Sequence, residues 1–114
     1  MAINSDWPTA KGAYNKQSLT DDTETTLLDD QQSRGLTRGC VIYAHSTAQA
    51  GTLNVYFIDR DDTDRLLQAT SVGADTLTAI DFDFHLPRYK ITWKTTASAA
   101  TTVFAEVFPY GANK

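Results

Sequence analysis

The sequence is poor in cysteine and in long apolar runs. Cys40 is its one cysteine, so no internal disulfide can form. Its apolar neighbours Val41 and Ile42 predict a thiol buried in a strand rather than a reactive one. No run approaches the ~18 consecutive apolar residues that a membrane-spanning helix needs, so we expect no membrane contact. The first residues lack the basic and apolar regions of a signal peptide. These absences favour assembly in a reducing compartment.

Clustered positive charge is also missing. The chain has 10 lysines and arginines against 14 aspartates and glutamates, which gives a formal net charge of −4. The basic residues are scattered, whereas a nucleic-acid-binding module normally presents a basic stripe that follows the phosphate backbone. The sequence therefore predicts no nucleic-acid partner.

Large apolar side chains are sparse in residues 1–24, where Trp7, Tyr14 and Leu19 stand isolated among polar residues. A segment of this composition buries too little apolar surface to offset the entropy lost on ordering. We therefore predict an extended N-terminal arm over residues 1–24, ordered only where it lies against another surface, and a β-domain over residues 25–114. Trp7 and Tyr14 are the expected anchors of the arm, because aromatic side chains bury much surface for few torsions.

From residue 25 onward the chain consists of short β-type runs separated by turn residues. Strands are expected at 25–29, 38–46, 52–59, 65–70, 76–84, 88–96 and 101–108. They recur about every 12 residues, which is typical of a sandwich or a jelly-roll-like barrel. The predicted fold class is therefore all-β: an antiparallel, jelly-roll-like β-sandwich of about 7–8 strands with the extended arm at its N-terminus.

One short connection suggests a specific strand pairing. If His85–Pro87 closes a hairpin, Asp81 and Asp83 lie across from Lys90 and Lys94. Oppositely charged cross-strand pairs of this kind help to fix the register of the two strands.

Three of the expected strands are apolar on both faces: Cys40–Ala44, Leu53–Ile58 and Val103–Phe108. An antiparallel sandwich with one solvated face does not need apolar residues on both faces of a strand. We therefore expect the second faces to be covered by the arm, by a sister subunit or by a different protein, although single apolar side chains at a surface are also normal. This pattern favours a component of an assembly.

Candidate catalytic and metal-binding groups do not form a recognisable site. Asp59–Asp64 carries carboxylates at alternate positions, but Asp64 stands where a calcium loop needs glycine. The preferred interpretation is a hairpin turn whose aspartates accept backbone hydrogen bonds. His45 and His85 have no second cysteine with which to form a zinc site. Cys40 and His45 lie on one strand but point to opposite faces. The sequence therefore predicts no enzymatic activity, no metal and no cofactor.

Two stretches carry a resemblance to a known group of proteins. The first is Leu28-Asp29-Asp30 followed by Arg34-Gly35, a strand and Ala48–Val55; the second is Leu86–Trp93 followed by Ser98–Val103. In this style of strand and turn, residues 25–110 resemble the small β-sandwich proteins of tailed-bacteriophage virions. That family includes capsid cement (decoration) proteins, neck and tail accessory proteins and receptor-binding modules. The resemblance implies a non-enzymatic virion component, often trimeric, and a chain with an N-terminal arm is most similar to a cement protein.

The function expected from this resemblance is that of a capsid cement protein, made in the host cytoplasm and located on the capsid surface of the virion. Its expected partners are the major capsid protein and further copies of itself, in a homotrimer. The residues expected to contact these partners are Trp7, Tyr14, Tyr56, Phe104, Phe108 and Tyr110.

A carbohydrate-binding or host-recognition module of a phage tail is the alternative function. Small β-sandwiches often bind sugars against aromatic side chains, because each ring offers a flat apolar surface. Trp93 lies in phase with Ile91 and is expected in the core, and Trp7 lies in the arm. The alternative therefore depends on tyrosine and phenylalanine rings, of which Tyr43 and Tyr56 are examples.

Overall fold

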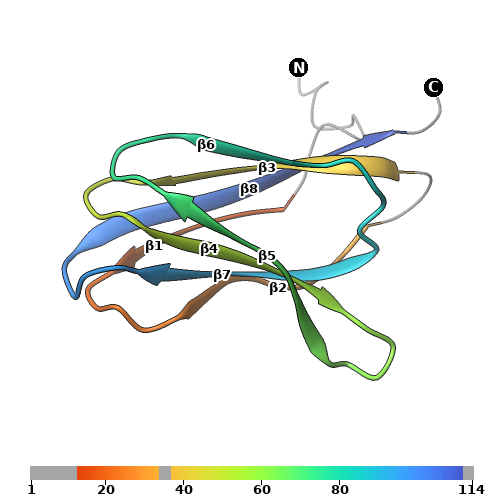
Figure 1. Ribbon diagram of the computed structural model, residues 1–114, viewed down its shortest axis with the longest axis horizontal. Helices are drawn as coiled ribbons and strands as arrows, with labels where there is room; N and C mark the ends of the chain where they lie inside the picture. Colours follow the sequence, from red (N-terminus) through yellow and green to blue (C-terminus); the bar gives the residue numbers. More distant parts are fainter. Residues whose placement is uncertain (1–12, 34–36, 112–114) are drawn as a thin grey trace, which may run out of the picture.

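Two antiparallel sheets of four strands each enclose the apolar core (Figure 1). The computed structural model describes residues 13–33 and 37–111. Within these ranges the strands are β1 (Tyr14–Leu19), β2 (Thr25–Gln32), β3 (Thr37–Ser46), β4 (Gly51–Ile58), β5 (Asp64–Val72), β6 (Thr78–Phe82), β7 (Arg88–Thr95) and β8 (Thr101–Gly111). Sheet A has the strand order β1-β8-β3-β6, and sheet B has the order β2-β7-β4-β5. The chain passes back and forth between the sheets as in a jelly roll, which confirms the predicted fold class.

The seven predicted strands correspond to β2 through β8, with ends displaced by a few residues. β4 and β5 form an antiparallel hairpin in which Ile58 is in register with Asp64. The described ranges contain no helix of the length and apolarity needed to cross a membrane.

The core is built around Trp93 of β7, which is fully buried together with Ile91. The indole nitrogen of Trp93 donates a hydrogen bond to Thr95 Oγ1 at 2.8 Å, so its one polar atom is satisfied. Gly51 packs directly against this ring, and a Cβ at that position would lie 2.6 Å from the carbonyl oxygen of Lys94. The first residue of β4 is therefore glycine because the adjacent strand leaves no room for a side chain.

Cys40 faces the same core from β3. Only 4% of its surface is exposed, and burial raises the pKa of its thiol to about 11. The prediction of a buried thiol is confirmed, because a desolvated thiol resists ionisation.

The predicted N-terminal arm includes a strand of the sandwich, so its boundary with the β-domain is wrong. Tyr14–Leu19 forms β1 and pairs antiparallel with β8 at the edge of sheet A. The side-chain amide of Asn15 donates to the Leu27 carbonyl oxygen at 2.8 Å, and that of Gln17 donates to the Thr26 carbonyl oxygen at 3.1 Å. These bonds connect β1 to β2 of the other sheet. β1 is therefore ordered by hydrogen bonds to its neighbours. Because it has few apolar residues, its sequence did not predict a strand.

The predicted hairpin between β6 and β7 is also wrong. β6 pairs with β3 in sheet A, whereas β7 lies between β2 and β4 in sheet B. The connection His85–Pro87 therefore carries the chain from one sheet to the other, and Leu86 is buried in the core as it crosses. Asp81 lies in register with Val41 of β3, on a different sheet from the lysines of β7.

Candidate binding surface

The outer face of sheet A carries a set of neighbouring ring side chains. In β8, Val103, Ala105 and Val107 face the core, so the alternating residues point outward. β3 contributes two outward rings in the same way, and β1 contributes one from the edge of the sheet. We call these six residues the aromatic face: Tyr14, Tyr43, His45, Phe104, Phe108 and Tyr110.

Contacts between the rings hold the aromatic face in shape. The Phe104 ring lies between two others, with centroid distances of 5.9 Å to Tyr14 and 5.8 Å to His45. Farther along the same strands, Phe108 packs edge-on against Tyr43 at 5.7 Å. Aromatic pairs of this geometry contribute about 0.5–1.5 kcal/mol beyond the area they bury. The rings are therefore positioned before any partner binds.

Polar groups interrupt the aromatic face. Glu106 is in register with Tyr14 on one side and with Tyr43 on the other, so a carboxylate stands between two tyrosines. His45 Nε2 lies 3.0 Å from Asp75 Oδ1, at the end of β3. The surface therefore offers both apolar area and hydrogen-bond acceptors, the combination found in protein recognition sites.

Tyr110 is fastened to the neighbouring strands. Its hydroxyl donates to Asp81 Oδ1 at 2.8 Å, with the carbonyl oxygen of Phe82 also within reach at 3.2 Å. The hydrogen bond to Asp81 raises the pKa of Tyr110. The ring crosses β3 at Gly39, where a Cβ would lie 2.5 Å from the tyrosine hydroxyl oxygen. The guanidinium carbon of Arg38 lies 5.6 Å from the ring centroid, in cation–π range.

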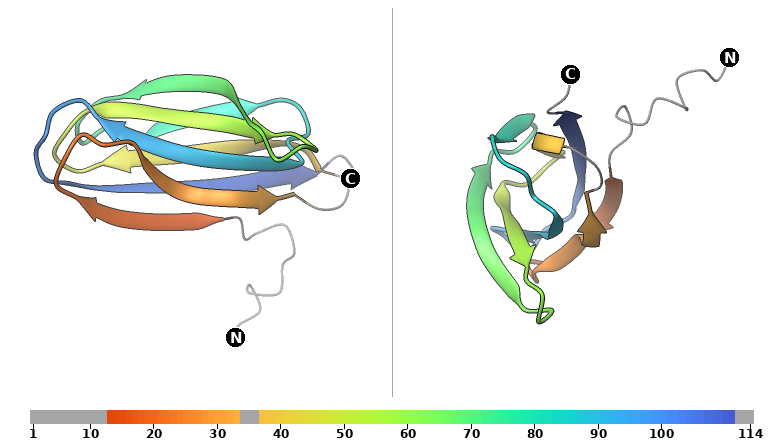
Figure 2. Two further views of the ribbon diagram at one scale, coloured as in Figure 1. Left: turned by 90° about the horizontal axis from the view of Figure 1, so that it is seen from below. Right: turned by 90° about the vertical axis from the view of Figure 1, so that its right-hand side faces the viewer.

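Four of the six predicted contact residues lie together on the aromatic face: Tyr14, Phe104, Phe108 and Tyr110. Tyr56 lies apart from them on β4, and its side chain points outward from sheet B. Figure 2 shows the two sheets as opposite layers of the sandwich. Trp7 lies outside the described residues.

The chain itself covers part of the outer face of sheet B. Glu24, in the loop before β2, accepts hydrogen bonds from Thr92 Oγ1 at 2.5 Å and from the Tyr56 hydroxyl at 2.9 Å. These two bonds lower the pKa of Glu24, with Thr92 the larger cause. Lys94 Nζ donates to the carbonyl oxygen of Asp22 at 2.7 Å. We expected the outer faces of the strands to be covered by the arm, by a sister subunit or by a different protein. On sheet B, the N-terminal region of the chain provides part of this cover.

The predicted contact set omitted Tyr43 and His45. The sequence pattern that could have indicated Tyr43 is the strand Cys40–Ala44. It is apolar on both faces, so its outward-facing side chains need a contact. His45 follows Tyr43 by two residues and so shares its face. Only the strand order shows that these side chains adjoin the rings of β8.

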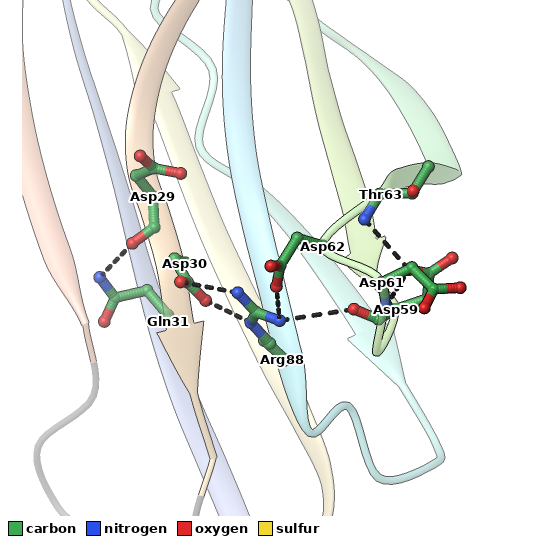
Figure 3. Close-up of polar contacts among 8 residues, drawn as sticks. All are labelled: Asp29, Asp30, Gln31, Asp59, Asp61, Asp62, Thr63 and Arg88. Atoms are coloured by element: carbon green, nitrogen blue, oxygen red, sulfur yellow. Dashed lines mark hydrogen bonds and ion pairs between the residues drawn. The ribbon is translucent and has the colours of Figure 1, made fainter.

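A separate polar cluster surrounds Arg88 at one end of sheet B (Figure 3). The guanidinium donates to both oxygens of the Asp30 carboxylate, at 2.6 and 2.9 Å, and to Asp62 Oδ1 at 2.7 Å. These charge-assisted bonds lower the pKa of Asp30 and raise that of Arg88. The cluster connects β2, β7 and the β4–β5 turn, so its role is to hold these segments together.

The acidic stretch after β4 is a hairpin turn, as predicted. Asp59 Oδ1 accepts hydrogen bonds from the backbone nitrogens of Asp61 at 2.8 Å and Thr63 at 3.0 Å. The bond from Thr63 is the main cause of a lowered pKa at Asp59. Asp62 has a φ of 63°, in the left-handed region that turns use. In the described part of the chain, no three His, Cys, Asp or Glu side chains gather as a metal site requires.

Comparison with known proteins identifies the fold. No protein-family model matches the sequence, and no curated protein matches it. The chain is similar in structure to the Yersinia pseudotuberculosis-derived mitogen, with 12% identity and a TM-score of 0.61 over 92% of this chain and 90% of that one. It is also similar to PirA, with 8% identity and a TM-score of 0.63 over 92% of this chain and 100% of that one.

A third similar structure is TmCBM61 in complex with beta-1,4-galactotriose. Its identity to this chain is 10% and the TM-score is 0.50, over 84% of this chain and 68% of that one. At identities this low, the three likenesses show only a shared β-sandwich architecture. They show nothing about the function of this chain.

Proposed function

We propose that the protein is a non-enzymatic binding protein that attaches to its partner through the aromatic face of sheet A. The observation that carries this proposal is the alternation in β8, where three small or medium core residues alternate with outward Phe104 and Phe108. Both rings are partly buried and keep some accessible apolar surface that a partner can bury. Because they already pack on Tyr14, His45 and Tyr43, little side-chain entropy remains to be lost on binding.

The chemistry of the remaining polar groups supports a role without catalysis. The thiol of Cys40 is buried with a raised pKa, and Arg88 is paired with the carboxylates of Asp30 and Asp62. Enzymes instead tend to place groups of perturbed pKa in an accessible cleft with a complementary partner. Among the described residues, the shifted pKa values come from structural hydrogen bonds, as at Asp30 and Arg88, or from burial, as at Cys40 and Tyr89.

The specific role we propose is that of a capsid cement protein on the surface of a tailed-phage virion. It is supported by the resemblance of residues 25–110 to small virion sandwiches and by the aromatic face, which suits attachment to the major capsid protein. A specific contact of this kind buries at least about 1,000 Å² in total. Because the protein then binds the assembled shell and not its separated subunits, it raises the resistance of the shell to disruption. We propose that copies assemble as a homotrimer around an axis of the shell.

Truncation of a central ring tests the proposal. The assay is a titration of purified protein onto capsids from a phage that lacks its gene, with bound protein measured after sedimentation. Phe108→Ala is expected to weaken binding at least about 30-fold, because aromatic hot spots contribute 2 kcal/mol or more. The matched control is Tyr56→Ala, which removes a ring from sheet B.

Denaturation midpoints of both variants separate a loss of stability from a loss of binding. The proposal predicts that Tyr56→Ala binds capsids like the unchanged protein once the folded fractions are equal. Equal capsid binding by Phe108→Ala and the unchanged protein would overturn the aromatic face as the attachment surface.

Carbohydrate binding by the same face is the second candidate function. The observation that favours it is Glu106, whose carboxylate stands between Tyr14 and Tyr43. Stacking rings beside a hydrogen-bond acceptor suit a sugar, which has apolar faces and hydroxyl donors. TmCBM61, which shares the sandwich architecture, is the protein that was solved with beta-1,4-galactotriose.

Calorimetry with a panel of oligosaccharides, including beta-1,4-galactotriose, distinguishes the two functions. Saturable binding at millimolar or tighter affinity that disappears in Tyr43→Ala would favour a host-recognition module of a phage tail. The cement proposal predicts no saturable sugar binding and retained attachment to capsids.

A further inference from the structure

Glu106 occupies the centre of the aromatic face. It lies on β8, between β1 and β3 in sheet A (Figure 1). Its register partners are Tyr14 on β1 and Tyr43 on β3, and residues directly opposite in an antiparallel pair have Cβ atoms about 4.5–5.5 Å apart. Along β8, Phe104 and Phe108 are two residues away on either side, so they share the outward face of Glu106. Four rings therefore surround one carboxylate, and we call these five residues the Glu106 site.

The Glu106 carboxylate has no partner within the described part of the chain. No group there donates a hydrogen bond to it or forms an ion pair with it. Lys16 is exposed on β1 but lies one row away, in register with Phe104. Glu106 differs in this from Glu24 and Asp30, whose carboxylates accept hydrogen bonds within the molecule. The fold therefore makes no use of the Glu106 charge among the residues described.

A partner that covers the aromatic face must also satisfy this carboxylate. Burying a charge without a counter-charge or a hydrogen bond carries a large desolvation cost, so a purely apolar partner surface would bind poorly. The surrounding rings favour one kind of donor, because the faces of tyrosine and phenylalanine rings attract cations. The Glu106 site is therefore electrostatically complementary to a positively charged group rather than to a neutral one.

We propose that the Glu106 site binds an arginine side chain of the protein partner. The guanidinium group is planar, so it can stack on an aromatic ring while it donates two parallel hydrogen bonds to the carboxylate. A lysine ammonium is a compact, strongly hydrated charge that gains less from such rings. The inference rests on the proposed function, because it takes the aromatic face as the attachment surface. It adds the chemical group that the partner presents to this face.

Titration with short peptides tests the site without any capsid. The probes are an acetylated Gly-Arg-Gly amide and the same peptide with citrulline, in which a neutral urea group replaces the guanidinium. Chemical-shift changes in NMR spectra measure both affinities. The arginine peptide should saturate the backbone amide signals of Glu106 and Tyr43 at about millimolar concentration, and the citrulline peptide should bind at least about tenfold more weakly. Equal affinities of the two peptides, or no saturable shift at Glu106, would overturn the proposal.

Glu106→Gln tests the site in the capsid titration, because this variant removes the charge and keeps the size of the side chain. It should bind capsids at least about tenfold more weakly than the unchanged protein. Its denaturation midpoint should not fall, since the carboxylate has no partner in the described part of the chain. The matched control is Asp61→Asn, which removes one negative charge from the β4–β5 turn and should bind capsids like the unchanged protein.

Phe108→Ala distinguishes failure of this inference from failure of the proposed function. If Phe108→Ala weakens capsid binding and Glu106→Gln does not, the aromatic face is still the attachment surface, but the inferred arginine contact is wrong. If neither variant weakens capsid binding, the proposed function fails as well. A weakening by Glu106→Gln that matches the one by Asp61→Asn would also overturn the inference, because it would reflect net charge rather than a contact at Glu106.

Discussion

Gly39 offers a sharp test of how sheet A is packed, because a single methyl group should disrupt it. A Cβ at this position would overlap the carbonyl oxygen of Phe82 and lie 2.5 Å from the hydroxyl oxygen of Tyr110. The tyrosine ring could rotate away, but the Phe82 oxygen belongs to the backbone of β6. Gly39→Ala therefore forces β6 to move away from β3.

The expected cost follows from the overlap. Overpacking of this kind costs about 1–3 kcal/mol, and for a domain of this size each kcal/mol lowers the melting temperature by about 4 °C. Gly39→Ala should therefore melt about 4–12 °C below the unchanged protein. The measurement is thermal unfolding followed by circular dichroism.

Gly73 provides the matched control for this substitution. A Cβ there would meet Thr76 Oγ1 at 3.4 Å, an ordinary contact, so Gly73→Ala should be neutral or slightly stabilising. Adding Tyr110→Ala to Gly39→Ala should recover only part of the loss, because the Phe82 oxygen remains. If Gly39→Ala and Gly73→Ala melted at the same temperature, the close approach of β3, β6 and Tyr110 described here would be incorrect.

Three further predictions concern single residues. Burial raises the pKa of the Cys40 thiol from 9.0 to about 11. At pH 8 the thiolate fraction should therefore be about a hundredfold lower in the folded protein than in the unfolded one. The rate of labelling with a maleimide before and after denaturation measures this difference. Asp30 and Asp59 have folded pKa values below the ordinary 3.8. Their contribution to stability is complete above the unfolded pKa and is lost as the pH falls through the folded values. Arg88 lowers the pKa of Asp30, whereas Thr63 and Arg65 lower that of Asp59. Urea unfolding of Arg88→Gln should therefore lose the Asp30 part of this dependence and show a weaker decline in stability between pH 5 and pH 2 than the unchanged protein. Gly51→Ala should lower the urea midpoint strongly, because the new methyl group meets the Lys94 carbonyl oxygen at 2.6 Å within the core.

Local patterns in the sequence predicted most strands but not the sheet to which each belongs. Ile80 and Phe82 are buried as their alternation predicted, whereas Phe84 is 45% exposed because β6 ends at Phe82. A short turn between two strands normally indicates a hairpin. Here the buried Leu86 anchors a crossing between sheets, and this long-range packing leaves no local signal.

The candidate surface shows the same limit. The alternation of residues predicted that Phe104 and Phe108 lie on one face of their strand. It cannot show which other strands are the neighbours of that strand in the sheet. Tyr56 was grouped with these rings although its strand lies in the other sheet. Tyr14 belongs to β1, whose sequence is mostly polar and whose order depends on pairing with β8. Such tertiary pairing overrides the weak local preference of a polar segment.

The orientation of the protein on its partner is the most direct test of the proposed function. Cryo-electron microscopy of decorated capsids would show which sheet lies against the shell. We expect Phe104, Phe108 and Tyr43 to contact the major capsid protein, with the outer face of sheet B directed toward solvent. A reconstruction in which sheet B and Tyr56 contact the shell, and the aromatic face is exposed to solvent, would contradict the proposal.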